Sequence, residues 1–137
     1  MIWKRDISIE AIKERSLNTM SDYVGIRWLE IGDDFIKASM PVDHRTQQPL
    51  GYLNGGASCV LAETIGSTAA NYAVDKNSYC VGLDINANHL RSAQAGDVIS
   101  VAMPLHLGSR TQVWEIKIFQ EEKLCCISRL TMAVLKK

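Results

Sequence analysis

Residues 54–67 read NGGASCVLAETIGS, two glycines followed by an apolar run of small residues with a single acid, Glu63, near its middle. We expect this run to form a helix from Gly55 to about Ala73, the only long helix of the chain. Its small residues would let a sheet or a second backbone approach closely. A carboxylate at Glu63 would lose hydration on burial, so it must be solvated, paired with a cation or used in a reaction.

The rest of the chain predicts a short amphipathic helix and a series of strands. Trp114, Ile116 and Ile118 alternate with Glu115 and Lys117, which is the period of a strand with one buried face. A helix is expected at Ser8–Arg15, a hairpin at 26–31 and 35–40 around the turn 32–34, and four further strands at 79–90, 97–107, 111–120 and 124–135.

This order of elements predicts an α+β domain that spans residues 1–137, without repeats or linkers. One face of a large antiparallel sheet needs a cover, and only the central helix is long enough to provide it. A sheet curled around one helix is the hot-dog fold, although the order of segments alone also permits other α+β sandwiches.

Composition excludes several classes of function. Fifteen basic residues balance fifteen acidic ones without long runs of either sign, so we expect no nucleic-acid or anionic-membrane partner. No apolar stretch approaches the roughly 20 residues of a membrane span, and the first residues lack the apolar region of a signal peptide, so a cytoplasmic protein is expected.

Cysteine and histidine positions argue against a metal site. The spacing of the four cysteines matches neither a zinc ribbon nor a redox motif, and we interpret them as reduced, mostly buried thiols. The three histidines have no cysteine or carboxylate at ligand spacing, so no metal is predicted. The cysteines are Cys59, Cys80, Cys125 and Cys126, and the histidines are His44, His89 and His106.

Five segments together resemble the hot-dog thioesterases of the 4-hydroxybenzoyl-CoA thioesterase type, over essentially the whole chain. These segments are Gln48–Gly56, Leu61–Ser67, Val81–Arg91, Pro104–Arg110 and Cys125–Leu130. Within that family the chain is most similar to two branches that motifs do not separate. One hydrolyses 1,4-dihydroxy-2-naphthoyl-CoA in menaquinone synthesis, and the other is a proofreading thioesterase that clears misloaded aryl carrier proteins.

The resemblance implies hydrolysis of aromatic acyl-CoA thioesters, with coenzyme A as part of the substrate and no other cofactor. Glu63 would attack the thioester carbonyl or activate the water that does. The Gly55 N–H, at a helix start with unpaired donors and partial positive charge, would hold the developing oxyanion. Gln48 would contact the carbonyl or the water, and Ser67, four residues after Glu63, would orient the carboxylate or the water.

The family pattern also implies an oligomer and a binding region for coenzyme A. Glu63 would face the Asn54–Gly55 loop of another chain, so the expected active unit is at least a dimer, and a dimer of dimers by resemblance. Gly82 matches a substrate contact, although a bulge or close packing also explains a glycine in a strand. The implied substrate and coenzyme contacts are Gly82, His89, Leu90, Arg91, Ser92, His106, Leu107, Gly108, Ser109, Arg110 and Thr111.

One residue departs from the family pattern. The family usually has His before the two glycines, whereas this chain has Asn54. An Asn amide can still donate a hydrogen bond, but it cannot carry a titrating proton. Asn is also among the best N-cap residues, so cap and catalytic roles both remain open for Asn54. We therefore expect a weakened or retuned hydrolase.

Two rival functions are also compatible with the sequence. A hot-dog hydratase or dehydratase would need a His with an acid on the central helix, and no histidine lies there. A non-catalytic acyl-CoA-binding protein is favoured by Asn54 and disfavoured by the presence of Glu63 with Ser67.

Overall fold

The computed structural model describes residues 1–137 and contains three helices and six strands. The helices are α1 (Ile9–Ser16), α2 (Met20–Tyr23) and α3 (Gly55–Tyr72). The strands are β1 (Arg27–Ile31), β2 (Ile36–Val42), β3 (Ser78–His89), β4 (Gly96–Leu107), β5 (Thr111–Gln120) and β6 (Lys123–Lys136).

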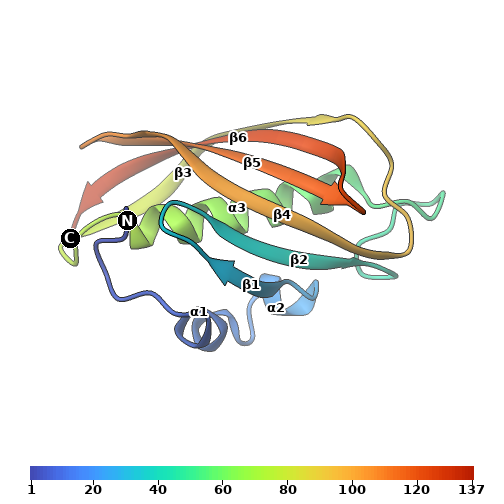
Figure 1. Cartoon of the computed structure of the whole chain (residues 1–137), viewed down its shortest axis with the longest axis horizontal. Helices are drawn as coiled ribbons and strands as arrows, with labels where there is room; N and C mark the ends of the chain where they lie inside the picture. Colours follow the sequence, from blue (N-terminus) through green and yellow to red (C-terminus); the bar gives the residue numbers. More distant parts are fainter.

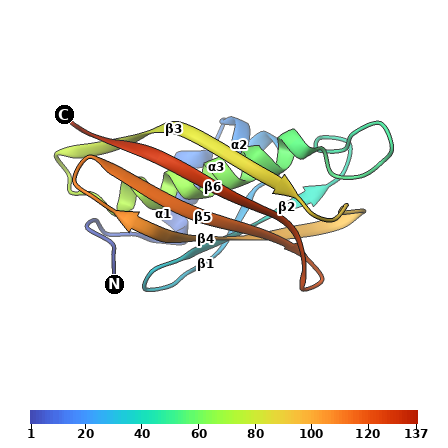
Figure 2. The same ribbon diagram turned by 90° about the horizontal axis from the view of Figure 1, so that it is seen from above.

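All six strands form one antiparallel sheet in the order β1-β2-β4-β5-β6-β3. The sheet curves over α3, which runs along its inner face (Figure 1 and Figure 2). The α+β class and the hot-dog arrangement predicted from the sequence are confirmed. The two edges of the sheet are β1 and β3, so β3 pairs with β6 on one side only.

Element predictions hold to within a few residues, with one omission. The hairpin of β1 and β2 closes through a hydrogen bond from Gly32 N to Phe35 O at 2.9 Å. The omitted element is α2, a single turn of four residues after Thr19, whose side chain makes no capping hydrogen bond to the helix. Such a short helix carries too few residues for a periodic pattern to predict it.

Small residues on α3 let the helix lie directly against β5 and β6. A Cβ placed on Gly66 would come within 2.7 Å of Leu130 Cδ2 and 3.2 Å of Ile116 Cδ1. Leu61, Ile65, Leu130 and Ile116 are among the fully or almost fully buried side chains of a single core between helix and sheet. The close approach predicted from the small residues of this helix is therefore confirmed.

The N-terminal segment ties α3 to the β1–β2 turn. Trp3 Nε1 donates to Gly32 O at 2.7 Å, and Lys4 N donates to Tyr72 O at 2.9 Å. Arg5 donates from Nε to Val74 O at 3.1 Å. The bonds to Tyr72 and Val74 fix the C-terminal end of α3. None of the helices has the length and apolar character required to cross a bilayer.

The start of α3 and its end lie at opposite ends of the sheet. The loop that precedes α3, the β3–β4 connection and the β5–β6 hairpin gather at one end, while the β4–β5 turn and both termini lie at the other (Figure 1). This placement decides which of the predicted site residues can meet within one chain.

Candidate active site

Asn54 caps α3. Its backbone is extended, with φ −65° and ψ 133°, and its side-chain oxygen accepts a hydrogen bond from Gly56 N at 2.7 Å. One of the orphan N–H groups of the helix start is thereby satisfied, as expected for an Asn N-cap. The cap role that the sequence left open is observed, and the side-chain nitrogen of Asn54 makes no hydrogen bond within the chain.

The loop before α3 holds Gln48 and Asn54 by backbone hydrogen bonds. Asn54 N donates to Thr46 O at 2.8 Å, Leu53 N to Ala93 O at 2.9 Å and Gln48 N to Tyr52 O at 2.8 Å. The side-chain oxygen of Gln48 accepts a hydrogen bond from Leu50 N. Its side-chain nitrogen makes no hydrogen bond within the chain and stays available as a donor, as the predicted role of Gln48 requires.

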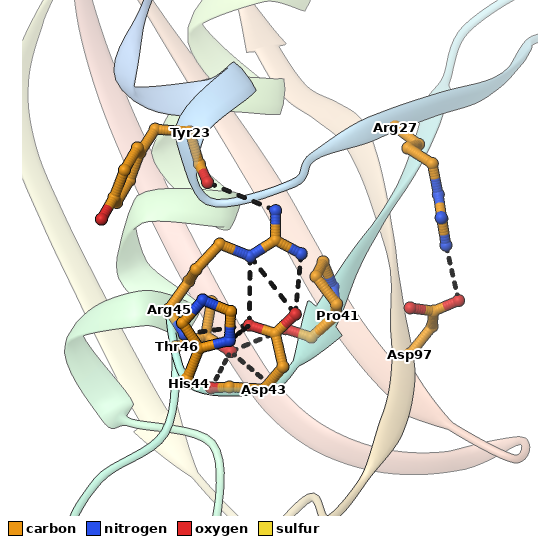
Figure 3. A network of polar contacts seen from close by, with 8 residues as sticks. All are labelled: Tyr23, Arg27, Pro41, Asp43, His44, Arg45, Thr46 and Asp97. Carbon is orange, nitrogen blue, oxygen red and sulfur yellow. Dashed lines mark hydrogen bonds and ion pairs between the residues drawn. The ribbon is translucent and has the colours of Figure 1, made fainter.

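A polar network anchors the first part of this loop (Figure 3). The guanidinium of Arg45 donates to both carboxylate oxygens of Asp43, with Nη2 to Oδ2 at 2.7 Å and Nε to Oδ1 at 3.1 Å, and reaches Tyr23 O at 3.4 Å. The hydroxyl of buried Thr46 donates to Pro41 O at 2.7 Å and accepts from Asp43 N at 3.1 Å. Through Tyr23, the unpredicted helix α2 thus helps to position the loop that carries Gln48.

The structure brings six of the predicted residues together at the start of α3. They line one cavity of about 330 Å³. The six are Gln48, Gly55, His89, Leu90, Arg91 and Ser92. The remaining lining residues were not predicted from the sequence, because their placement depends on contacts between segments that are distant in the chain. They are Tyr52, Leu53, Ser58, Ala93 and Cys125.

Glu63 lies elsewhere, with its carboxylate over the backbone of β3. A Cβ placed on Gly82 would come within 2.7 Å of Glu63 Oε1, so glycine is required there for the carboxylate to occupy this position. A bulge in the pairing of β3 with β6 follows directly, between Gly82 and Asp84. Glu63 is solvent-exposed within a single chain and forms no ion pair, so its charge remains hydrated rather than buried.

Ser67 is not hydrogen-bonded to Glu63, although both residues lie on α3 four positions apart. Ser67 instead lines a second cavity of about 220 Å³, which lies between α3 and the helices α1 and α2. The walls of that cavity are rich in hydroxyl groups, including those of Thr64, Thr68 and Ser16. Of the two roles predicted for Ser67, the contact with the carboxylate is absent from the single chain, and orientation of the water stays a prediction.

The segment His106–Thr111 lies at the opposite end of the sheet from His89–Ser92. Thr111 pairs with Ala133, which in turn pairs with Val81, eight residues before His89. At about 3.3 Å per residue, the two predicted coenzyme-binding segments are separated by about 26 Å along the strands. Both lie at strand ends as predicted, but one chain does not bring them together.

The four cysteines are free thiols, and three of them are buried, as interpreted from the sequence. Burial raises the pKa of Cys80 to about 11 and, together with the neighbouring Cys59 and Cys125, that of Cys126 to about 11. Both thiols therefore stay protonated at neutral pH and are unsuited to act as nucleophiles.

Comparison with known proteins agrees with this architecture. Residues 50–127 match the family described as the thioesterase superfamily. The chain is 55% identical over 136 residues to the 1,4-dihydroxy-2-naphthoyl-CoA hydrolase of Escherichia coli, covering 98% of this chain and 100% of that protein. It is 48% identical over 137 residues to the proofreading thioesterase EntH of Cronobacter sakazakii, covering 98% and 99% of the two chains.

Among solved structures, a thioesterase of Haemophilus influenzae superposes with a TM-score of 0.97 at 48% sequence identity, covering 99% of this chain and 96% of that one. The two structures therefore share the same fold over nearly their full length, including the long helix, the curved sheet and the loop before the helix.

The ion pair of Asp43 makes a testable contribution to stability. Hydrogen bonds from Arg45 lower the pKa of Asp43 to about 2. A carboxyl group with a lowered pKa stabilises the folded state fully above its unfolded pKa of about 4, and this contribution is lost as the pH falls through the folded pKa. We expect Asp43→Asn to be less stable than the parent at neutral pH, with the difference shrinking between about pH 4 and pH 2.

Urea unfolding of both proteins across this pH range measures the difference. The control is Asp34→Asn, which changes an exposed carboxylate that forms no ion pair and should leave stability close to the parent at each pH. A difference for Asp43→Asn that is constant from pH 7 to pH 2 would contradict the role of the ion pair.

Proposed function

The chain belongs to the thioesterase superfamily and is a thioester hydrolase, and from this premise we propose that it acts on aromatic acyl-CoA thioesters, with 1,4-dihydroxy-2-naphthoyl-CoA as the first candidate. The 55% identity to a hydrolase of that thioester supports the proposal. The 48% identity to a proofreading thioesterase supports a second candidate, an acylated aryl carrier protein. The hydratase and the non-catalytic binding protein find no support among these relatives.

In the proposed reaction Glu63 attacks the thioester carbonyl carbon or removes a proton from the attacking water. The carboxylate is exposed and free of ion pairs, so both a thioester carbonyl carbon and a water molecule can reach it. Gly55 N–H, at the positive end of an 18-residue helix, would stabilise the oxyanion, and the free amide nitrogen of Gln48 would donate to the carbonyl or the water. These steps require only side chains, backbone and water, so we propose that no cofactor takes part.

The separation of Glu63 from Gly55 is the observation that favours a site shared between chains. Eight residues of α-helix place the two positions about 12 Å apart along the axis of α3. A carbonyl carbon and its oxygen are only about 1.2 Å apart, so this spacing favours contacts of one thioester with groups from two chains. We propose that Glu63 of one chain acts with Gln48 and Gly55 of a second chain.

Two surfaces support the proposed dimer of dimers. Strand β3 is an unpaired edge with exposed apolar side chains at Tyr79, Val81 and Leu83, and an edge of this kind can pair with a second copy. On the outer face of the sheet, Ile99 and Met103 of β4 are also exposed and would be covered by a second dimer.

A two-chain site also accommodates the coenzyme. His89–Ser92 and His106–Thr111 could approach each other only from different chains, because they lie at opposite ends of one sheet. Neither Arg91 nor Arg110 takes part in any of the six ion pairs of the chain, so both remain free for phosphate groups. We also propose a reducing, cytoplasmic location, which agrees with four free thiols.

The first test replaces the proposed catalytic carboxylate. Glu63→Gln keeps the size of the side chain but cannot attack or accept a proton, so we expect at least about a 100-fold loss of thiol release. The assay compares 1,4-dihydroxy-2-naphthoyl-CoA, a fatty acyl-CoA and an acylated aryl carrier protein. Glu10→Gln, the same change on the exposed first turn of α1, serves as the control. Undiminished hydrolysis by Glu63→Gln would refute the mechanism, and preference for the carrier protein would favour the second candidate.

The second test removes the Gly55 N–H while preserving the helix. Proline is favoured at the first position of a helix, and the extended backbone of Asn54 is compatible with a following proline. We expect Gly55→Pro to lower kcat by about 100-fold or more, since a lost oxyanion donor has effects of this size. Gly55→Ala retains the N–H but adds the same Cβ, which approaches the His89 imidazole at 3.0 Å. The loss in Gly55→Ala therefore measures the effect of the Cβ, and a further loss in Gly55→Pro measures the missing N–H.

Mixing the two inactive proteins distinguishes a shared site from a site within one chain. When Gly55→Pro and Glu63→Gln chains are unfolded together and refolded, random pairing should restore about a quarter of the parental activity if the site is shared. No recovery in refolded mixtures that contain the mixed dimer would contradict a shared site.

The third test concerns the residue that departs from the family pattern. Asn54→His supplies an imidazole beside the carbonyl, and we expect turnover of aryl-CoA to rise roughly tenfold. Because the cap on Gly56 N is lost, the free energy of unfolding should fall by about 1 kcal/mol. Steady-state kinetics and urea unfolding measure the two effects, and an unchanged or lower turnover in a folded variant would contradict the prediction.

A further inference from the structure

The side chain of Gln120 holds the loop that connects β3 with β4 (residues 90–95). Gln120 is the last residue of β5, and its Oε1 accepts a hydrogen bond from Gln94 N at 3.0 Å while its Nε2 donates to Gln94 O at 2.7 Å. At this end of the sheet the last backbone pair of β4 with β5 is Ile99 with Phe119. One side-chain amide therefore takes the place of a strand backbone and binds the loop beyond the end of the ladder.

The β3–β4 loop in turn supports the residues that precede α3. Ala93, next to Gln94, is buried, and its carbonyl oxygen accepts a hydrogen bond from Leu53 N at 2.9 Å. Two residues after Leu53 comes Gly55, whose N–H is the proposed oxyanion donor. The β5–β6 hairpin, the β3–β4 loop and the loop before α3 lie together at one end of the sheet (Figure 1). A continuous path therefore runs from Gln120 to the start of the helix.

The middle of the β3–β4 loop has little other support. Its beginning is fixed because Arg91 N donates to Cys125 O at 3.2 Å, and β4 begins at Gly96, which pairs with β2. Between these two points the only hydrogen bonds of the loop backbone are the one at Ala93 and the two from Gln120. Loss of the Gln120 side chain would therefore leave Ala93 as the single anchor of this stretch.

The turn that follows Gln120 is strained. Gln120 pairs with Lys123, so the turn between β5 and β6 consists of Glu121 and Glu122, and both have positive φ, at 49° and 65°. A left-handed backbone disfavours residues with a side chain, and glycine or asparagine usually occupies such a turn. Strain of this kind persists where the surrounding structure over-determines the conformation. The two hydrogen bonds of Gln120 with the β3–β4 loop are one such constraint on this hairpin.

We propose that Gln120 is a positioning residue for the reaction proposed above, on which this inference rests. Gln120 does not line the cavity that contains Gly55, so it would act through the β3–β4 loop rather than on the substrate. By holding Ala93 against Leu53, it keeps the N–H of Gly55 aimed at the thioester oxygen. A small displacement of an oxyanion donor slows the chemical step without unfolding the protein.

Steady-state kinetics with 1,4-dihydroxy-2-naphthoyl-CoA test this role. Gln120→Met keeps the approximate length of the side chain and removes both hydrogen bonds, so we expect kcat to fall about tenfold with KM changed less than about threefold. The matched control is Gln94→Met, because only the backbone of Gln94 binds Gln120, and it should behave as the parent. An unchanged kcat in Gln120→Met, or an equal loss in the control, would overturn the proposal. So would a raised KM with an unchanged kcat, which would assign Gln120 to the support of Arg91 and coenzyme binding.

Combination with Gly55→Pro separates positioning of the donor from a general loss of structure. Once the N–H of Gly55 is absent, Gln120→Met should change kcat less than about twofold, because the group that Gln120 positions is already missing. The same tenfold loss in both backgrounds would show that Gln120 acts on something other than this N–H and would overturn the proposal.

Amide hydrogen exchange followed by NMR tests the path without a substrate. Gln120→Met should speed exchange of the Leu53 amide about tenfold and leave that of Ile116, in the buried part of β5, unchanged. Unchanged exchange at Leu53, or equal acceleration at Ile116, would contradict a local path. Failure of the proposed function is distinguishable, because the parent would then release no thiol from any thioester. Failure of this proposal alone leaves Glu63→Gln inactive and Gln120→Met as active as the parent.

Discussion

The whole structure depends on how closely α3 lies against the strands that surround it. At three positions a glycine leaves room for a side chain of another element. Gly66 admits Leu130 and Ile116 of the sheet, Gly82 of β3 admits Glu63 of the helix, and Gly55 admits His89. The first contact lets the sheet wrap the helix, and the other two decide where a carboxylate and an imidazole are held. Packing and chemistry are therefore set by the same constraint on side-chain size.

The sequence predicted much of this arrangement because the relevant signals are local. The run of small apolar residues around Glu63 marked α3, and the alternation around Trp114 marked a strand with one buried face, and both are confirmed. The contact of His89 with Gly55 was not predictable, since it joins residues far apart in the chain. The helical spacing of Ser67 and Glu63 suggested a contact, yet Ser67 lines the cavity between α3 and the helices α1 and α2. Shared spacing on a helix indicates a shared face but does not establish a hydrogen bond.

The length of α3 separates the two halves of the proposed chemistry. Its first turn offers hydrogen-bond donors and partial positive charge, whereas its middle carries the only acid of the helix. Keeping these groups apart within one chain has a physical benefit, because a carboxylate beside the helix start would occupy the donors that the oxyanion requires. The loop network of Asp43, Arg45 and Thr46 then holds the donor end in place before any substrate arrives.

The unpaired edge of β3 affects how a single chain interacts with other extended chains. Twelve residues of strand, with Tyr79, Val81 and Leu83 exposed, form a template on which any extended chain could add. In the proposed dimer a second copy would cover this template, and a chain that has not yet paired would expose it. Substitutions along β3 are therefore expected to affect the solubility of unpaired chains as well as the proposed pairing.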